Sequence, residues 1–231
     1  MNGNGMFLLL IGTVLGGLAQ MKVKSAYARA SQIPANNGLT GAEIAKRIMA
    51  DNGITDVGLE QVAGTLSDHY DPKAKVVRLS ADVYGGTSLA AQGIAAHEIG
   101  HVIQHAKSYS MLQIRNIAVP LASVAPTISY VILGIGAAAN SIGLITLAVL
   151  LYSAVAIFQI VNLPVEFDAS RRAKVELDKM GLVTGSELEE VDSVLDAAAL
   201  TYVAATVSAV LMVLQMAIQY GLLGGRRNEQ Q

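Results

Sequence analysis

The stretch NIAVPLASVAPTISYVILGIGAAANSIGLITLAVLLYSAVAIFQIVNLPV, residues 116–165, contains no Asp, Glu, Lys or Arg in fifty positions. A bilayer core about 30 Å thick is crossed by roughly 20 apolar helical residues, so the stretch is long enough for two crossings. The segment AAANSIG at 137–143 is rich in small and turn-forming residues and predicts a hairpin, with spans at 117–137 and 142–163. The sequence therefore predicts a polytopic membrane protein.

Two further uncharged segments predict two more spans. Residues 197–225 are free of charge and predict a span at 199–222, and the first twenty-one residues predict a shorter one at 6–22. Lys22 and Lys24 follow this first apolar run, whereas a signal peptide carries its positive charge before the run. We therefore interpret it as a retained anchor helix, the alternative being cleavage after AYA at 26–28.

The four spans divide the chain into five parts. In chain order these are an anchor at 1–22, a region at 23–115, a hairpin at 116–163, a segment at 164–196 and a last span at 197–225. All Lys and Arg residues except Arg226 and Arg227 lie in or directly beside the two segments between the spans. Because basic residues near membrane ends mark the cytoplasmic face, we expect both segments to be cytoplasmic.

The region 23–115 predicts a small α+β domain. Thr40 and Glu43 form a capping box before one helix, and VGLEQV at 57–62 and KVVRLS at 75–80 predict short strands. The second of these strands offers an edge to which an extended substrate could pair. A further helix is expected from Thr87 or Ser88 to about Lys107. The expected fold is mainly α, with about four transmembrane helices and this cytoplasmic α+β domain.

The helix IAAHEIGHVIQH at 94–105 contains the pattern HExxH. On a helix, His97 and His101 lie one turn apart and can bind one zinc ion, while Glu98 lies beside that ion and can take a proton from its water. The alternative is a polar stripe on an ordinary helix. A buried carboxylate and two imidazoles without a partner would be costly, which favours the metal site. The sequence has no cysteine, so thiolate ligands and disulfides are excluded.

The third ligand must come from elsewhere in the chain. His105 is eight residues from His97, about 12 Å along a straight helix, so we expect it on the surface or supporting a ligand. Glu166 is the first charge after the uncharged stretch, and Pro164 predicts that a new helix begins there. Two His and one Glu with an open fourth position form a known catalytic zinc set. The alternative is that Glu166 is a carboxylate at the membrane interface that pairs with Arg171 or Arg172.

Several blocks carry a resemblance to a known family: LTGAEIA at 39–45, DHYDP at 68–72, IAAHEIGHVIQH at 94–105, LPVEFDASRRA at 163–173 and VLDAAALTYVAA at 194–205. The chain resembles the neutral zinc metallopeptidases of bacterial membranes, the YugP-like family. This resemblance implies a zinc-dependent peptidase in the bacterial inner (plasma) membrane, and it implies the class of reaction better than the substrate.

A more distant similarity extends to the HtpX-type and CAAX-processing membrane proteases. These carry a glutamate ligand in the pattern E-x-x-A-D-x-x-A, which Glu166, Ala169 and Ala173 match. The similarity strengthens Glu166 as the third ligand. Ser170 stands where the pattern has an Asp that supports a ligating histidine, so Ser170 or Asp168 is expected to take over that support.

The predicted function is that of a membrane-embedded, gluzincin-like zinc metalloendopeptidase with one zinc ion per chain. Its substrates are expected to be membrane proteins or membrane-proximal segments, with no nucleic acid partner and with room for a homo-oligomer or a membrane-protein partner. His69 and Tyr70 are candidates for contacting the substrate or the transition state, or else are turn residues. The alternative function is a non-catalytic scaffold with a closed structural site, for which His69 could supply a fourth ligand.

Overall fold

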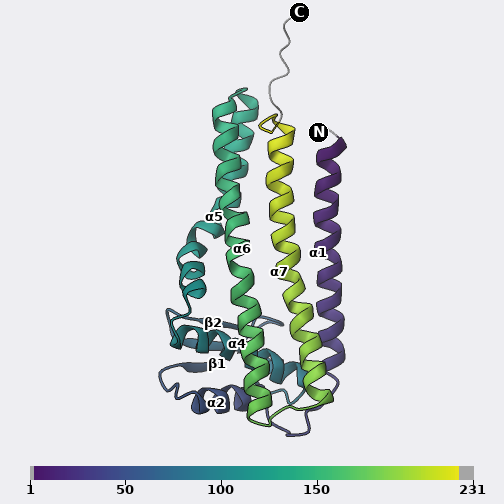
Figure 1. Ribbon diagram of the computed structural model, residues 1–231, viewed down its shortest axis with the longest axis vertical. Helices are drawn as coiled ribbons and strands as arrows, with labels where there is room; N and C mark the ends of the chain where they lie inside the picture. The colour runs from purple at the N-terminus through teal and green to yellow at the C-terminus, as the bar shows by residue number, and fades with distance from the viewer. Residues whose placement is uncertain (1–2, 224–231) are drawn as a thin grey trace, which may run out of the picture. The chain divides into compact units, whose positions relative to one another are not determined.

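A computed structural model describes residues 3–223, which form seven helices and three strands (Figure 1). In chain order these are α1 (Gly3–Ala30), α2 (Gly41–Asp51), β1 (Gly58–Val62), β2 (His69–Asp71), β3 (Val76–Ser80), α3 (Ala81–Tyr84), α4 (Leu89–Ala106), α5 (Ser110–Ala138), α6 (Ile142–Lys179) and α7 (Ser186–Gln219). The chain forms two compact units. Within the described residues, the first comprises 3–19, 114–163 and 201–223, and the second 20–113 and 164–200.

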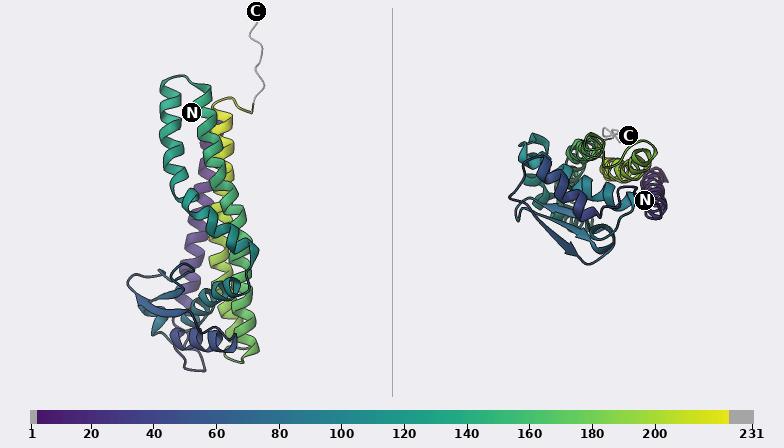
Figure 2. Two further views of the ribbon diagram at one scale, coloured as in Figure 1. Left: turned by 90° about the vertical axis from the view of Figure 1, so that its left-hand side faces the viewer. Right: turned by 90° about the horizontal axis from the view of Figure 1, so that it is seen from below.

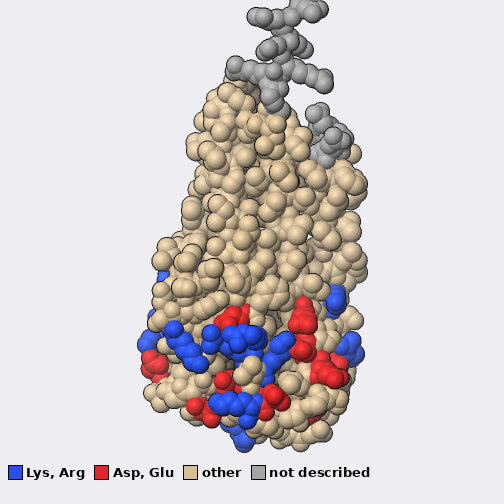
Figure 3. All heavy atoms as spheres, viewed as in Figure 1, with Lys and Arg blue, Asp and Glu red and all other residues tan. Residues whose placement is uncertain are grey.

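The first unit consists of apolar helical segments. Helices α1, α5, α6 and α7 are each long and apolar enough to cross a membrane. Many of their large apolar side chains are exposed, among them Leu10, Ile117 and Leu150, which would be unfavourable in water but not in lipid. Arg115 is the one charged residue among the described residues of this unit. Figure 3 shows a wide surface free of Lys, Arg, Asp and Glu, and the charged side chains on that face gather in a separate band. The expectation of a mainly helical chain with four helices long and apolar enough to span a membrane is confirmed.

The second unit contains a three-stranded sheet of order β1-β3-β2, in which β1 is parallel and β2 antiparallel to β3. Helix α4 packs against the sheet and against α2 (Figure 2). The small α+β region is thus present, and its cytoplasmic location stays a prediction. The prediction that β3 offers a free edge to a substrate is wrong, because both sides of β3 are paired. The strand β2 is three residues long and was not predicted.

Helix α4 begins and ends where the sequence predicts. The Ser88 hydroxyl accepts a hydrogen bond from the Ala91 amide at 3.2 Å, and Lys107 is the residue at the C-terminal cap. The helix is buried along most of its length, with Leu89, Ile99 and Ile103 in the core. The predicted capping box of α2 is also present, since Thr40 and Glu43 bond each other's backbone amides. Hydrogen bonds at the helix caps therefore determine where α2 begins and where α4, the helix that carries the histidines, begins.

The prediction that a new helix begins at Pro164 is wrong. Pro164 lies inside α6, which continues without a break to Lys179. Proline lacks an amide donor and so removes one hydrogen bond of the helix, but it does not force the helix to end when its neighbours continue on both sides. Glu166 is consequently held by a regular helix rather than by a connecting loop.

Candidate metal centre

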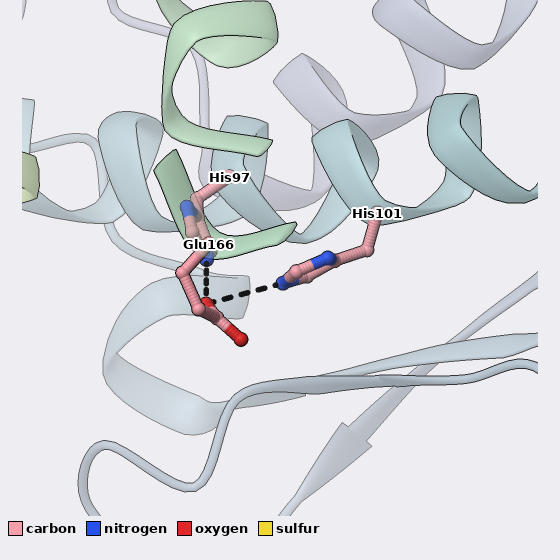
Figure 4. A group of neighbouring side chains, drawn as sticks. All are labelled: His97, His101 and Glu166. Atoms are coloured by element: carbon pink, nitrogen blue, oxygen red, sulfur yellow. Dashed lines mark ion pairs between the residues drawn. The ribbon is translucent and has the colours of Figure 1, made fainter. Parts of the chain in front are cut away.

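Three side chains from two helices meet in the second unit. His97 and His101 project from α4 and Glu166 from α6, and their ligand atoms all lie within 4.8 Å of one another (Figure 4). Glu166 Oε2 is 3.4 Å from His97 Nε2 and 3.5 Å from His101 Nε2. His101 and Glu166 are buried, and His97 is partly buried. The sequence proposed these three residues as ligands, and the structure brings them together.

The spacing of these atoms suits a tetrahedral ion. With zinc bonds of 2.0–2.2 Å, two ligand atoms of a tetrahedral site are separated by about 3.3–3.6 Å. The two separations between the imidazole nitrogens and the carboxylate fall in this range, and they exceed the ~2.9 Å of a typical N–H···O bond. Two imidazoles and a carboxylate are also a common donor set for zinc. The residues present therefore fit this metal.

The close approach of α4 and α6 depends on Gly100. A Cβ atom at this position would lie 2.4 Å from the backbone oxygen of Ala169 and 2.9 Å from its carbonyl carbon. Backbone atoms of a packed helix cannot move aside as a flexible side chain can. Any larger residue at position 100 must therefore push α6, and with it Glu166, away from the histidines.

Substitution of Gly100 by Ala is expected to weaken zinc binding and to destabilise the protein by about 1–3 kcal/mol, the usual cost of overpacking. Gly93→Ala is the matched control on the same helix, because its Cβ would meet the Val191 side chain at 2.9 Å rather than the backbone of α6. Zinc affinity and the thermal midpoint of the detergent-purified protein measure both effects. Equal zinc affinity in the two variants would contradict this role of Gly100.

Each histidine is also contacted through its second ring nitrogen. His97 Nδ1 lies 3.1 Å from the Ser170 hydroxyl, and His101 Nδ1 lies 3.0 Å from Gln104 Oε1. The Gln104 amide in turn donates to Asp168 Oδ2 at 3.0 Å. Ser170 thus contacts one ligand directly, while Asp168 reaches the other through Gln104. Such partners set the orientation of imidazole ligands.

Gln104 was not among the residues that the sequence pointed to. It is fully buried and follows His97 by seven residues and His101 by three, so that all three share one face of α4. That spacing can be read from the sequence. The contact with Asp168 on the neighbouring helix, which makes Gln104 important, cannot be read from the sequence.

Glu98 lies beside the ligands and is almost completely buried, at 8% exposure. Burial raises the pKa of its carboxyl group; the neighbouring His97 and His101 oppose this shift, and the charge of Glu166 adds to it. For His101, burial alone would lower the pKa, but Glu166 outweighs burial and the pKa is raised.

The remaining candidates lie outside the ligand group. His69 is exposed, and its ring contacts the backbone oxygen of Ser67 at 2.8 Å. Tyr70 is buried with its hydroxyl 2.6 Å from His105 Nδ1, and burial raises the pKa of Tyr70 to about 12, so the phenol stays protonated. A role for His69 or Tyr70 toward the substrate stays a prediction. His105 contacts Tyr70 rather than a member of the ligand group.

The two arginines that the sequence offered as partners of Glu166 bond another residue. Arg171 and Arg172 both pair with Asp168, two positions after Glu166. Asp168 thus serves as the acceptor for both arginines and for Gln104, while Glu166 faces the histidines. The geometry favours Glu166 as a ligand over the alternative of a boundary ion pair.

Comparison with known proteins identifies the family of the chain. Residues 5–221 match the family described as "Putative neutral zinc metallopeptidase". The chain belongs to this family. A curated relative, "Putative membrane protease YugP" of Bacillus subtilis (strain 168), is 43% identical over 220 residues, which are 95% of this chain and 97% of the relative. No solved structure matches the chain significantly. The resemblance inferred from the sequence blocks is confirmed, and the zinc metallopeptidase family implies zinc as the metal.

Family membership and the four apolar helices together identify an integral membrane protein of a zinc metallopeptidase family. The group of His97, His101 and Glu166 is the one in the described residues at which three or more His, Cys, Asp or Glu side chains could hold such an ion. It also lies within the residues that match the family.

Proposed function

We propose that the protein is a membrane-embedded zinc metalloendopeptidase of the HExxH-plus-Glu type. His97, His101 and Glu166 would hold one zinc ion, and three protein ligands would leave that ion accessible to water and substrate. The observation that carries the proposal is the meeting of these three side chains, with both imidazole nitrogens at a zinc-like separation from the Glu166 carboxylate and the carboxylate of Glu98 beside them. The relative's description as a membrane protease supports a protein substrate.

Zinc in such a site supplies a Lewis acid that polarises a carbonyl and lowers the pKa of a bound water to about 7. Glu98 accepts a proton from the attacking water and delivers it to the leaving amine. Burial raises the pKa of Glu98 and so makes its carboxylate a stronger base than an exposed one. Ser170 and Gln104 keep the two imidazoles oriented while the proton moves.

The alternative of a scaffold with a structural zinc site is less well supported. Structural zinc sites usually have four protein ligands. Among residues 3–223 the candidate group has three, and His69, the proposed fourth, is exposed and bonded to its own loop. Three ligands and a neighbouring buried carboxylate favour catalysis.

The location of the site supports substrates at or near the membrane. The charge asymmetry of the sequence favours a cytoplasmic second unit in a bacterial inner membrane. Both ligand-bearing helices contribute to that unit. We therefore propose membrane proteins, or unfolded segments beside the membrane, as substrates.

The test is zinc content and cleavage measured on the full chain in detergent. We expect about one zinc per chain, cleavage of an unfolded reporter, loss of cleavage after chelation and recovery when zinc is returned. His105→Ala is the control, and it should keep its zinc because His105 bonds Tyr70 rather than the ligand group. A zinc-loaded chain that cleaves neither soluble nor membrane-anchored unfolded reporters would support the scaffold instead.

A further inference from the structure

Gln104 connects the two helices that carry the ligands. Its side chain is fully buried, and three groups surround its amide. Nε2 lies 2.7 Å from the backbone oxygen of Val165 and 3.0 Å from Asp168 Oδ2, and Oε1 lies 3.0 Å from His101 Nδ1. Every polar atom of this amide is therefore engaged, on one side with a ligand and on the other with residues that flank a ligand.

The chemistry of these partners fixes which way the amide points. The carbonyl of Val165 and the carboxylate of Asp168 can only accept hydrogen bonds, so they require the NH₂ group. Flipping the amide would set its oxygen against two other oxygens. Arg171 and Arg172 both pair with Asp168 and thereby favour its ionised, accepting form.

The amide orientation in turn fixes the proton on His101. Oε1 of Gln104 can only accept, so the neutral imidazole must carry its hydrogen on Nδ1. The lone pair then lies on Nε2, the atom that faces Glu166. His97 differs, because the Ser170 hydroxyl at its Nδ1 can donate or accept and does not impose a tautomer.

We infer that Gln104 is a positioning residue for the metal centre, which holds His101 in its Nδ1–H form and fixes α6 beside Glu166. This inference rests on the proposed function, because it concerns the zinc site. It assigns Gln104 no contact with the substrate. Its effect is to keep the lone pair of the neutral imidazole on Nε2, the nitrogen that faces Glu166, and loss of such partners typically lowers metal affinity roughly 10- to 100-fold.

Gln104→Met is the decisive substitution, because Met has similar length but neither accepts from His101 nor donates to Val165. Gln92→Met is the matched control. Gln92 is a second fully buried glutamine on α4, and its amide donates to Asn37 at 2.6 Å and to the Leu39 carbonyl at 2.7 Å, away from the ligands. Both substitutions remove buried hydrogen bonds, so both are expected to lower the thermal midpoint.

Zn²⁺ affinity, measured by competition with a chromophoric chelator, separates the two variants. We expect roughly 10- to 100-fold weaker binding in Gln104→Met and a change below about twofold in Gln92→Met. The visible spectrum of the Co²⁺-loaded protein should change in the first variant alone. If both variants lost affinity equally, Gln104 would be a structural residue only.

The tautomer has its own readout in ¹⁵N-histidine-labelled protein, which has only four histidines to resolve. In the zinc-loaded wild type we expect His101 to show a protonated Nδ1, whose exchange with water becomes faster in Gln104→Met. An unprotonated His101 Nδ1 would overturn the inference even if zinc is bound. A wild type that binds no Zn²⁺ would instead overturn the proposed function.

Discussion

Glu98→Gln is expected to reduce peptide-bond cleavage by about 10²- to 10⁴-fold, the usual contribution of a general base. Gln has the same shape as Glu but cannot accept a proton from water at neutral pH. Glu98 is not one of the three residues at ligand spacing, so the variant should keep about one zinc per chain. The measurement is the initial rate on an unfolded reporter, with zinc content determined on the same preparation.

Stability provides a control for this variant. Burial disfavours the ionised form of Glu98, which is why its pKa is raised. A neutral Gln avoids that cost, so the thermal midpoint should be equal to or above that of the wild type. Undiminished cleavage by a zinc-loaded Glu98→Gln protein would show that another group activates the water, or that a contaminating protease is responsible.

The second large effect is expected for Glu166→Ala, which should lose tightly bound zinc. It removes one of three ligand atoms and the negative charge that the two imidazoles face. We expect affinity to fall by more than the roughly 100-fold that supporting residues can contribute. Zinc content after dialysis and chelator competition measure the change, and cleavage should be lost with the metal.

The control for Glu166→Ala is Glu176→Ala on the same helix. Glu176 is also a buried carboxylate, but it accepts a hydrogen bond from Asn52 at 3.1 Å and lies outside the ligand group. This variant should lose stability and keep its zinc. A Glu166→Ala protein that still holds one tightly bound zinc would place the third ligand elsewhere in the chain.

The parts of the fold that were predictable from sequence are those set by local chemistry. Uncharged stretches revealed the spans, because no charge interrupts them. The caps at Thr40 and Ser88 revealed two helix starts, because a hydroxyl before a helix bonds its first free amides. The spacing of His97 and His101 placed them on one face, because helix geometry does not depend on the rest of the fold.

The parts that were missed depend on contacts between distant segments. The sequence around Gln104 does not predict that its amide will bond Val165 and Asp168, which lie more than sixty residues away. The rule that proline starts a helix failed at Pro164, because the residues on both sides favour one continuous helix. The contact between Tyr70 and His105 was likewise not predicted, because it joins a strand to a helix 35 residues further along the chain.

The contact between Gly100 and Ala169 has a consequence for engineering. The motif HExxH leaves its two middle positions open, yet here the second of them is occupied by a residue whose missing side chain lets α4 and α6 touch. Copying the two histidines and the glutamate alone onto another pair of helices would not reproduce the metal centre. An alanine at the position of Gly100 would already push the two ligand-bearing helices apart. A designer would have to specify the glycine with the same care as the histidines.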